Sequence, residues 1–213
     1  MVRKAFTLRL EPAALSQYKH HHDNIWPELV TEIERCGIST MSAFTTDPVV
    51  FYYSEIQESD AWHKLWSTST HDRWGEHMKP LIAFTEEGKV DAHDLNEIFR
   101  LENSSASTEH RLAYSLRLEP SALAQYREQH DKIWPELVKE MDRCGIARLT
   151  AFEDDPIVYY YADLLRADAF DRLFETEIHA RWAGTFEGQI AFTEAAQVDV
   201  RFMDEIFHLD TAA

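Results

Sequence analysis

Residues 18–29 read YKHHHDNIWPEL, and 108 positions later residues 126–137 read YREQHDKIWPEL. The similarity extends outward in both directions, because residues 1–101 and 109–209 align without a gap and about half of the paired residues are identical. A repeat of this length predicts two structural copies of one design.

The connection between the copies, residues 102–108, reads ENSSAST and is polar, small and aperiodic. This composition is typical of a linker. We therefore expect one domain at residues 1–101 and a second at residues 109–213.

Each copy predicts the same order of elements. In the first copy, residues 3–10 alternate between polar and apolar side chains, which predicts a strand with one buried face. Residues 11–35 keep a helical period, and Pro27 is expected to divide this helix near residues 24–26. The rest of the copy predicts, in order, strands at 38–44 and 49–56 joined by a turn at Asp47-Pro48, a helix at 59–66 capped by Ser59, a helix at 71–84 and a strand at 95–101.

The order β-α-β-β-α-β is that of a ferredoxin-like, α+β fold. A four-stranded sheet of this kind has helices on one face and leaves the other bare. Two such sheets can bury their bare faces together. The tandem chain therefore predicts two ferredoxin-like repeats forming an intramolecular dimeric α/β barrel, a pseudo-dimer that leaves further homodimerisation open.

Composition excludes several classes of function. The net charge of −17 argues against nucleic acid or an anionic membrane as a partner, because both require a basic surface. Cys36 and Cys144, one per copy, form no disulfide framework, and the N-terminus has no apolar signal-peptide core, so we expect a cytoplasmic protein. The sequence has no glycine-rich phosphate loop, GxSxG, paired cysteines or HExxH.

A tyrosine and a histidine recur at helical spacing in both copies. Tyr18 and His22 are four residues apart and share a helix face, and Tyr126 and His130 repeat the pair. Both histidines are candidates for chemistry because the duplication kept them. A structural hydrogen bond on a helix face remains the other explanation.

A metal site on the three histidines at residues 20–22 is not expected. The second copy has Glu128 and Gln129 in place of the first two, and consecutive helical residues point in different directions. We expect neither a metal nor a cofactor.

Aromatic and polar residues form a further shared set. Trp26 is explained by core packing as well as by binding. His71, Arg73 and Trp74 place polar groups beside a flat ring, a combination that suits the hydroxyls and the apolar face of a sugar, although a surface position also explains His71. Glu28 lies in an expected first helical turn, where the dipole favours a carboxylate. The second copy repeats these residues as Trp134, His179, Arg181, Trp182 and Glu136.

The chain resembles the L-rhamnose mutarotase family. The resemblance is carried by VRKAF at residues 2–6, the block at residues 18–29, the Arg73-Trp74 pair and EIF at residues 97–99, and it covers each copy nearly end to end. Members of this family are usually single-domain chains that dimerise into an α/β barrel and interconvert the α and β anomers of L-rhamnose. The resemblance therefore implies an isomerase, an aldose mutarotase acting on a small neutral monosaccharide.

The resemblance also implies roles for individual residues. His22 and His130 would be the catalytic acids, while the general base stays open among His71, Asp23 and a water. The expected substrate-binding set is Tyr18, Tyr126, Trp26, Trp134, His71, His179, Arg73, Arg181, Trp74 and Trp182.

Two departures from the family pattern occur in both copies. The family has a second sugar-contacting tyrosine where this chain has Met41 and Leu149, and a second tryptophan where it has Gly75 and Ala183. These losses predict a wider pocket, so we expect L-rhamnose or a related deoxysugar such as L-fucose as the substrate.

Two other functions remain as alternatives. One is a sugar-binding or regulatory module that kept the pocket and lost turnover. The other is a small monooxygenase or haem-handling protein, which the expected fold alone suggests.

Overall fold

The computed structural model describes residues 1–106, 108 and 110–211. Ser107 of the predicted linker, and Glu109, Ala212 and Ala213 of the predicted second domain, lie outside the described residues. The chain forms two compact units with bounds that differ from the two sequence copies: residues 1–95 with 204–213, and residues 96–203.

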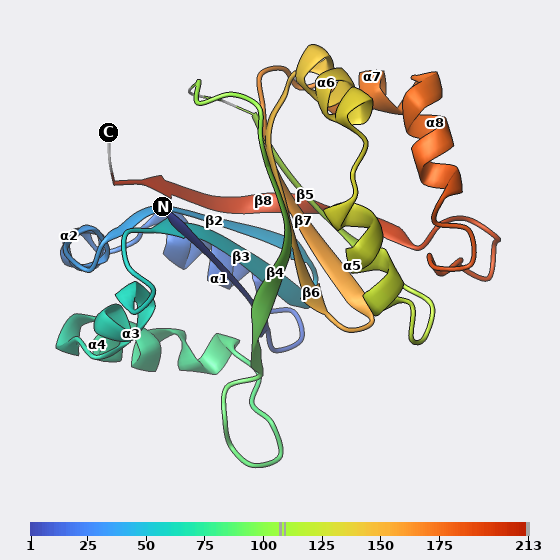
Figure 1. Cartoon of the computed structure of the whole chain (residues 1–213). Helices are drawn as coiled ribbons and strands as arrows, with labels where there is room; N and C mark the ends of the chain where they lie inside the picture. Colours follow the sequence, from blue (N-terminus) through green and yellow to red (C-terminus); the bar gives the residue numbers. More distant parts are fainter. Residues whose placement is uncertain (107, 109, 212–213) are drawn as a thin grey trace. The chain divides into compact units, whose positions relative to one another are not determined.

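The first unit contains three strands and four α-helices before the long strand β4. Its helices cover one face of its strands (Figure 1). The elements are β1 Val2–Arg9, α1 Leu15–Asp23, α2 Pro27–Arg35, β2 Ile38–Thr46, β3 Val49–Ile56, α3 Ala61–Trp66, α4 Ser69–Met78, the 3-10 helix η1 Lys79–Leu81 and the start of β4 Ala92–Glu102.

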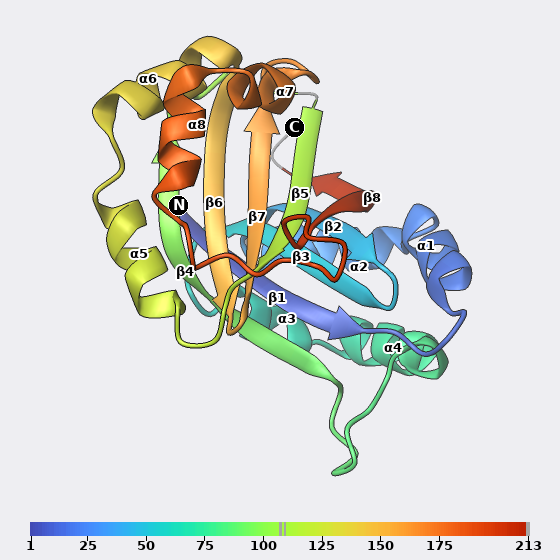
Figure 2. The same cartoon turned by 90° about the vertical axis from the view of Figure 1, so that its right-hand side faces the viewer.

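The second unit repeats this order, and its helices α5, α6 and α8 flank β6 and β7 (Figure 2). The elements are β5 His110–Arg117, α5 Leu123–Asp131, α6 Pro135–Cys144, β6 Ile146–Asp154, β7 Ile157–Leu164, α7 Ala169–Phe174, α8 Glu177–Gly184 and the start of β8 Val200–Asp210.

The two longest strands each contribute to both units. Residues 92–95 of β4 pair with β1, and residues 96–102 pair with β6. In the same way β8 pairs with β5 through residues 200–203 and with β2 through residues 204–210. The last strand segment of each sequence copy therefore completes the sheet built by the other copy.

The strand order is β1-β3-β2-β8-β5-β7-β6-β4, which closes as a barrel. All pairings are antiparallel. The predicted fold class, two ferredoxin-like repeats in one barrel, is confirmed.

Three local predictions need correction. The first helix begins at Leu15, not residue 11, because the preceding turn places Ala13 at a φ of 64°. The helix predicted to end at residue 84 ends at Met78, since Pro80 has no N–H to continue it. Ser59 does not cap α3; Asp60 precedes that helix without a side-chain hydrogen bond.

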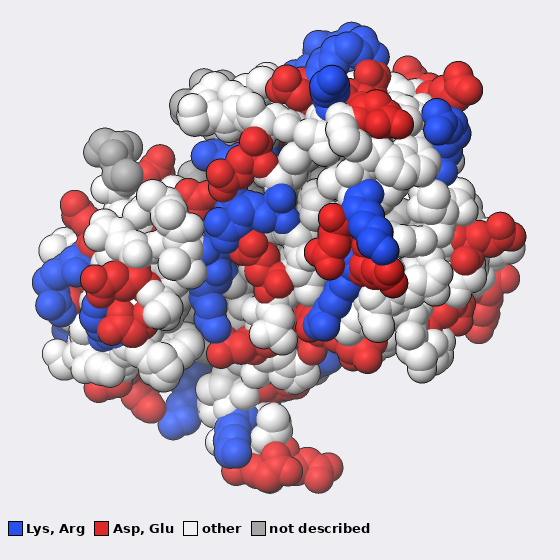
Figure 3. Space-filling model, in the orientation of Figure 1, with Lys and Arg blue, Asp and Glu red and all other residues white. Residues whose placement is uncertain are grey.

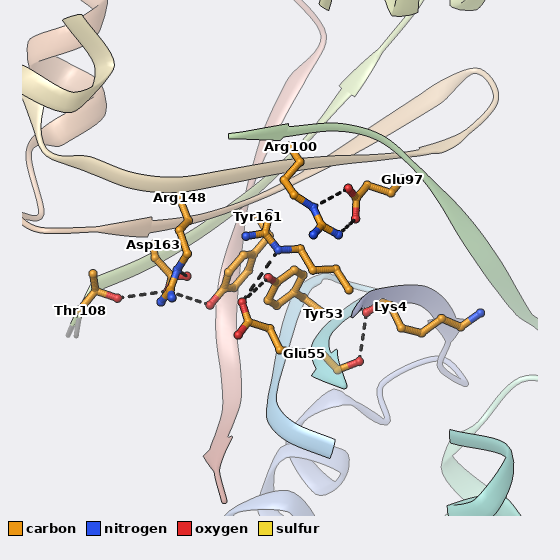
Figure 4. Close-up of polar contacts among 11 residues, drawn as sticks. Lys4, Tyr53, Glu55, Glu97, Arg100, Thr108, Arg148, Tyr161 and Asp163 are labelled. Carbon is orange, nitrogen blue, oxygen red and sulfur yellow. Dashed lines mark hydrogen bonds and ion pairs between the residues drawn. The ribbon is translucent and has the colours of Figure 1, made fainter. Parts of the chain in front are cut away.

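The strand face turned away from the helices carries its own polar network (Figure 4). In the first unit the Tyr53 hydroxyl donates to Glu55 at 3.0 Å. In the second unit, Asp163 accepts from the Tyr161 hydroxyl at 2.9 Å and from Arg148 Nε at 2.8 Å. Successive side chains of a strand point to opposite faces, so these groups lie across the strands from the residues that face the helices.

Surface charge is acidic overall but mixed in sign. On the face shown in Figure 3, Lys and Arg side chains are interspersed with Asp and Glu. Many of the ion pairs between these side chains are exposed and join residues one helical turn apart, such as Lys19 and Asp23 at 2.7 Å. Such pairs contribute little to stability.

Candidate active site

A cavity of about 780 Å³ lies in the first unit, between the helix-facing side of β1–β3 and the helices that cover it. Aromatic and aliphatic side chains make up most of its wall, and acidic and basic side chains surround part of it. Residues central to its chemistry are Tyr18, His22, Tyr52, Trp62, His71 and Trp74.

Helix α1 places Tyr18 and His22 on the cavity wall. Their rings lie 4.5 Å apart, as the four-residue spacing predicts. The helix ends at Asp23 and a new one begins at Pro27, so the predicted break is confirmed. Trp26 before the proline is extended, with φ −66° and ψ 132°, which redirects the chain just after His22.

Three side chains in this wall form a hydrogen-bonded chain. His22 Nδ1 lies 3.0 Å from the Tyr18 carbonyl oxygen. Because a carbonyl can only accept, Nδ1 carries the proton and Nε2 is the acceptor. Nε2 in turn accepts from the Tyr52 hydroxyl at 3.0 Å, and that hydroxyl is hydrogen-bonded to the Tyr18 hydroxyl. The hydrogen-bonded chain thus runs from Tyr18 through Tyr52 to the unprotonated Nε2 of His22.

Burial keeps all three groups neutral. It lowers the pKa of His22 to about 4, against a smaller opposing effect of its bond to the Tyr18 carbonyl. Burial also raises the pKa of Tyr18 and of Tyr52 above the ordinary value of a phenol. At neutral pH His22 is therefore an unprotonated imidazole with a usable lone pair, whereas the expected acid role requires an imidazolium.

Aromatic contacts hold the His22 ring in place. Trp74 packs edge-on against it at 5.6 Å, and Phe207 of β8 does so at 5.2 Å. On the strand side, Phe6 stacks on Tyr52 at 4.7 Å. The ring of His22 is thus fixed by helix, strand and the returning C-terminal segment.

Several predicted binding residues lie behind this wall. The Arg73 guanidinium sits 5.6 Å from the centre of the Trp26 ring, and Arg73 also pairs with Glu28 at 3.4 Å. The Trp26 ring contacts Trp74 edge-on at 5.2 Å, so it supports the wall from outside. Neither Arg73 nor Trp26 lines the cavity.

The candidates for the general base separate clearly. Asp23 is exposed, pairs with Lys19 at 2.7 Å and does not line the cavity. His71 does line it, and burial lowers the pKa of this imidazole. His71 therefore stays as a candidate general base on the cavity wall.

Sequence reasoning missed Tyr52 and Phe207. The shared tyrosines at 52 and 160 in the two copies were a usable signal for Tyr52, since its strand alternation turns it toward the helices. No sequence signal pointed to Phe207, because this residue belongs to the other sequence copy and reaches His22 only through the pairing of β8 with β2.

The second unit keeps the hydrogen-bonded chain. His130 Nδ1 donates to the Tyr126 carbonyl at 3.0 Å, and the Tyr160 hydroxyl donates to His130 Nε2 at 3.1 Å. Tyr126 and Tyr160 share a further hydroxyl contact. Burial lowers the pKa of His130 as well.

The other predicted residues of the second unit pack as their counterparts do. The Arg181 guanidinium lies 5.2 Å from the Trp134 ring centre, and Trp134 contacts Trp182 at 5.3 Å. His179 packs against Phe174 at 4.9 Å.

The described residues contain no group of three or more His, Cys, Asp or Glu side chains placed to hold a metal ion. Within the same part of the chain, no helix is long and apolar enough to cross a bilayer.

Known proteins match each copy of this chain. A family model described as L-rhamnose mutarotase matches the chain twice, at residues 3–101 and 111–209. The chain belongs to the L-rhamnose mutarotase family. The double match confirms the tandem duplication that the repeat predicted.

Individual relatives match one copy at a time. The L-rhamnose mutarotase of Bacillus subtilis is 32% identical over 104 residues, which is 48% of this chain and 100% of that protein. The L-rhamnose mutarotase of Oceanobacillus iheyensis is 31% identical over 104 residues, again 48% of this chain and 100% of that protein.

Solved structures of low identity share the fold over the full length. A crystal structure of a candidate monooxygenase from Fusobacterium nucleatum has a TM-score of 0.66 at 8% identity and covers 98% of this chain and 94% of that one. A candidate monooxygenase from Lactobacillus acidophilus has a TM-score of 0.58 at 10% identity, covering 99% and 97%. At these identities the likeness concerns the fold alone.

The two departures from the L-rhamnose mutarotase pattern both lie at the cavity. Met41 and Gly75 line it. A Cβ built on Gly75 meets no atom within 4 Å, so the space that a larger side chain would fill is open.

Proposed function

We propose that the first unit binds a deoxyhexose and interconverts its α and β anomers, with L-rhamnose or a related sugar such as L-fucose as substrate. The observation that carries the proposal is the hydrogen-bonded chain of Tyr18, Tyr52 and His22 on the wall of a cavity that can hold a monosaccharide. Membership in the L-rhamnose mutarotase family supports the same reaction.

His22 acts as a proton acceptor when the sugar ring opens. Its pKa of about 4 leaves it neutral at pH 7. The anomeric hydroxyl gives its proton to the Tyr52 oxygen while Tyr52 passes its own proton to His22 Nε2. The C1–O5 bond breaks, and the ring oxygen takes a proton from a water, because burial lowers the pKa of His71 and leaves that imidazole neutral at pH 7.

Reclosure reverses these transfers on the other face of the aldehyde. After rotation about C1–C2, the C5 hydroxyl attacks C1 and returns its proton to the hydroxide that the water left. The carbonyl oxygen, now the anomeric hydroxyl, recovers a proton from His22 through Tyr52. His22 is thus the acid of ring closure and the base of ring opening, which revises the expected acid role in one direction of the reaction. Proton transfer by positioned groups contributes about 10²–10⁴-fold.

The cavity wall suits a deoxysugar. The flat rings of Trp62 and Trp74 provide surfaces for the apolar face of the pyranose. Apolar side chains such as Leu65 and Ile33 accommodate a methyl group in place of a hydroxymethyl group. Hydroxyl groups find partners in Tyr18 and in the charged residues at the cavity edge, including Asp72.

The test is catalysed anomer exchange, followed by saturation-difference NMR of the anomeric protons of L-rhamnose and L-fucose. Wild-type protein accelerates exchange of at least one of these sugars, and His22→Asn removes the acceleration while far-UV circular dichroism stays unchanged. A sugar-binding module without turnover would give saturable binding and no acceleration, and that result would refute the proposal.

A further inference from the structure

The second unit carries a phenylalanine where the first has a methionine on the cavity wall. Phe186 aligns with Met78, which ends α4 and lines the cavity. The Phe186 ring lies 5.0 Å from Tyr126, 5.3 Å from His130 and 5.2 Å from Trp182. The counterparts of these three rings in the first unit face the cavity, so the Phe186 side chain covers the surfaces that a sugar would touch.

Three carboxylates at the edge of the first cavity have no counterpart in the second unit. Asp94, which lines the first cavity, aligns with Phe202, and the Phe202 ring lies 5.7 Å from Tyr114. Asp72 and Glu76 align with Ala180 and Gly184. Three carboxylates that can bond sugar hydroxyls are therefore replaced by groups that cannot.

A smaller pocket in the second unit measures about 260 Å³. Its wall includes Gln129, Trp134, Trp182 and Thr185 but neither Tyr126 nor His130. It gives no access to the hydrogen-bonded chain.

We propose that each chain has one working sugar site, in the first unit, and that the second copy of the site has become packed core with Phe186 in the place of the sugar. This inference rests on the proposed function of the first unit. His130 then has a structural role: it joins the Tyr126 carbonyl to the Tyr160 hydroxyl inside the unit. The chain of hydrogen bonds persists without chemistry because losing one member leaves buried polar groups unpaired.

Kinetics and a crystal soak test the two claims separately. Exchange of L-rhamnose is measured for wild type, His22→Asn and His130→Asn, and crystals of the wild type are soaked in L-rhamnose. We expect density for one sugar per chain, beside His22, complete loss of catalysed exchange in His22→Asn, and the wild-type rate per folded chain in His130→Asn. Met78→Phe, which places a ring where Phe186 lies, abolishes exchange and the sugar density.

Each outcome of the kinetic measurements and the soak has one interpretation. Sugar density beside both His22 and His130, or about half the wild-type rate in each single variant, overturns the single site. Density beside His22 with no acceleration by the wild type leaves the single site standing and refutes the proposed function. Density at neither position refutes both. The soak decides the question even if His130→Asn does not fold.

Discussion

Replacing Tyr52 by phenylalanine tests the proton relay most directly. The substitution removes one oxygen atom and keeps the ring that stacks on Phe6 at 4.7 Å. It breaks two hydrogen bonds, one to the Tyr18 hydroxyl and one of 3.0 Å to His22 Nε2. Both partners are buried, so each is left without its partner inside the unit.

The substitution is expected to affect both stability and rate. Leaving a buried polar group unpaired costs about 1–3 kcal/mol of unfolding free energy, and each kcal/mol lowers the Tm by about 2–4 °C for a chain of this size. Loss of the path to His22 removes a proton transfer worth about 10²–10⁴-fold in rate. Tyr52→Phe should therefore lower the exchange rate far more than its modest destabilisation explains.

Tyr160→Phe is the matched control, because Tyr160 makes the same two contacts in the second unit. Both variants are compared by thermal unfolding under circular dichroism and by saturation-difference NMR of L-rhamnose. We expect a similar drop in Tm for both and loss of exchange for Tyr52→Phe alone. Wild-type exchange in a folded Tyr52→Phe protein would show that no proton passes through this hydroxyl.

Three further predictions concern protonation and backbone. Burial lowers the pKa of His22 to about 4, so the unfolded chain binds more protons than the folded chain between pH 6.5 and 4. The contribution of neutral His22 to the free energy of unfolding is therefore complete above pH 6.5 and falls by about 1.4 kcal/mol per pH unit between pH 6.5 and 4. Urea unfolding between pH 7.5 and 5 should thus show a steeper loss for the wild type than for His22→Asn, and parallel curves would contradict this. The rate of catalysed exchange should stay level from pH 8 to about 5 and fall at lower pH, since His22 must be neutral. A rate that falls steadily as the pH rises above 5 would instead identify the imidazolium as the acid that opens the ring. Gly75→Ala should raise the unfolding free energy by about 0.5–1 kcal/mol, because Gly75 is helical and its Cβ meets nothing within 4 Å. Gly145→Ala should lower it by about 1–2 kcal/mol, because Gly145 has a φ of +99° and its Cβ would lie 2.9 Å from Arg166 Cγ; denaturant titrations that rank the two variants the other way would contradict the backbone reasoning.

Features set by short stretches of chain were predictable. A helix brings residues four apart together, so the Tyr18–His22 pair followed from spacing alone. A proline cannot continue a helix, so the break before Pro27 followed too. The gapless repeat predicted two copies of one fold, since identical patterns bury their apolar faces in the same way.

Only the tertiary structure determined which residues meet at the candidate site. Tyr52 comes from a strand thirty residues beyond His22 and Phe207 from the other sequence copy, and both meet that imidazole only because β3 and β8 pair beside β2. The neutral state of His22 follows from burial, which depends on every element packed around it. The same holds for the difference between the two copies: Met78 and Phe186 are both ordinary apolar residues in sequence, and the space around their neighbours determines that one borders a cavity and the other fills it.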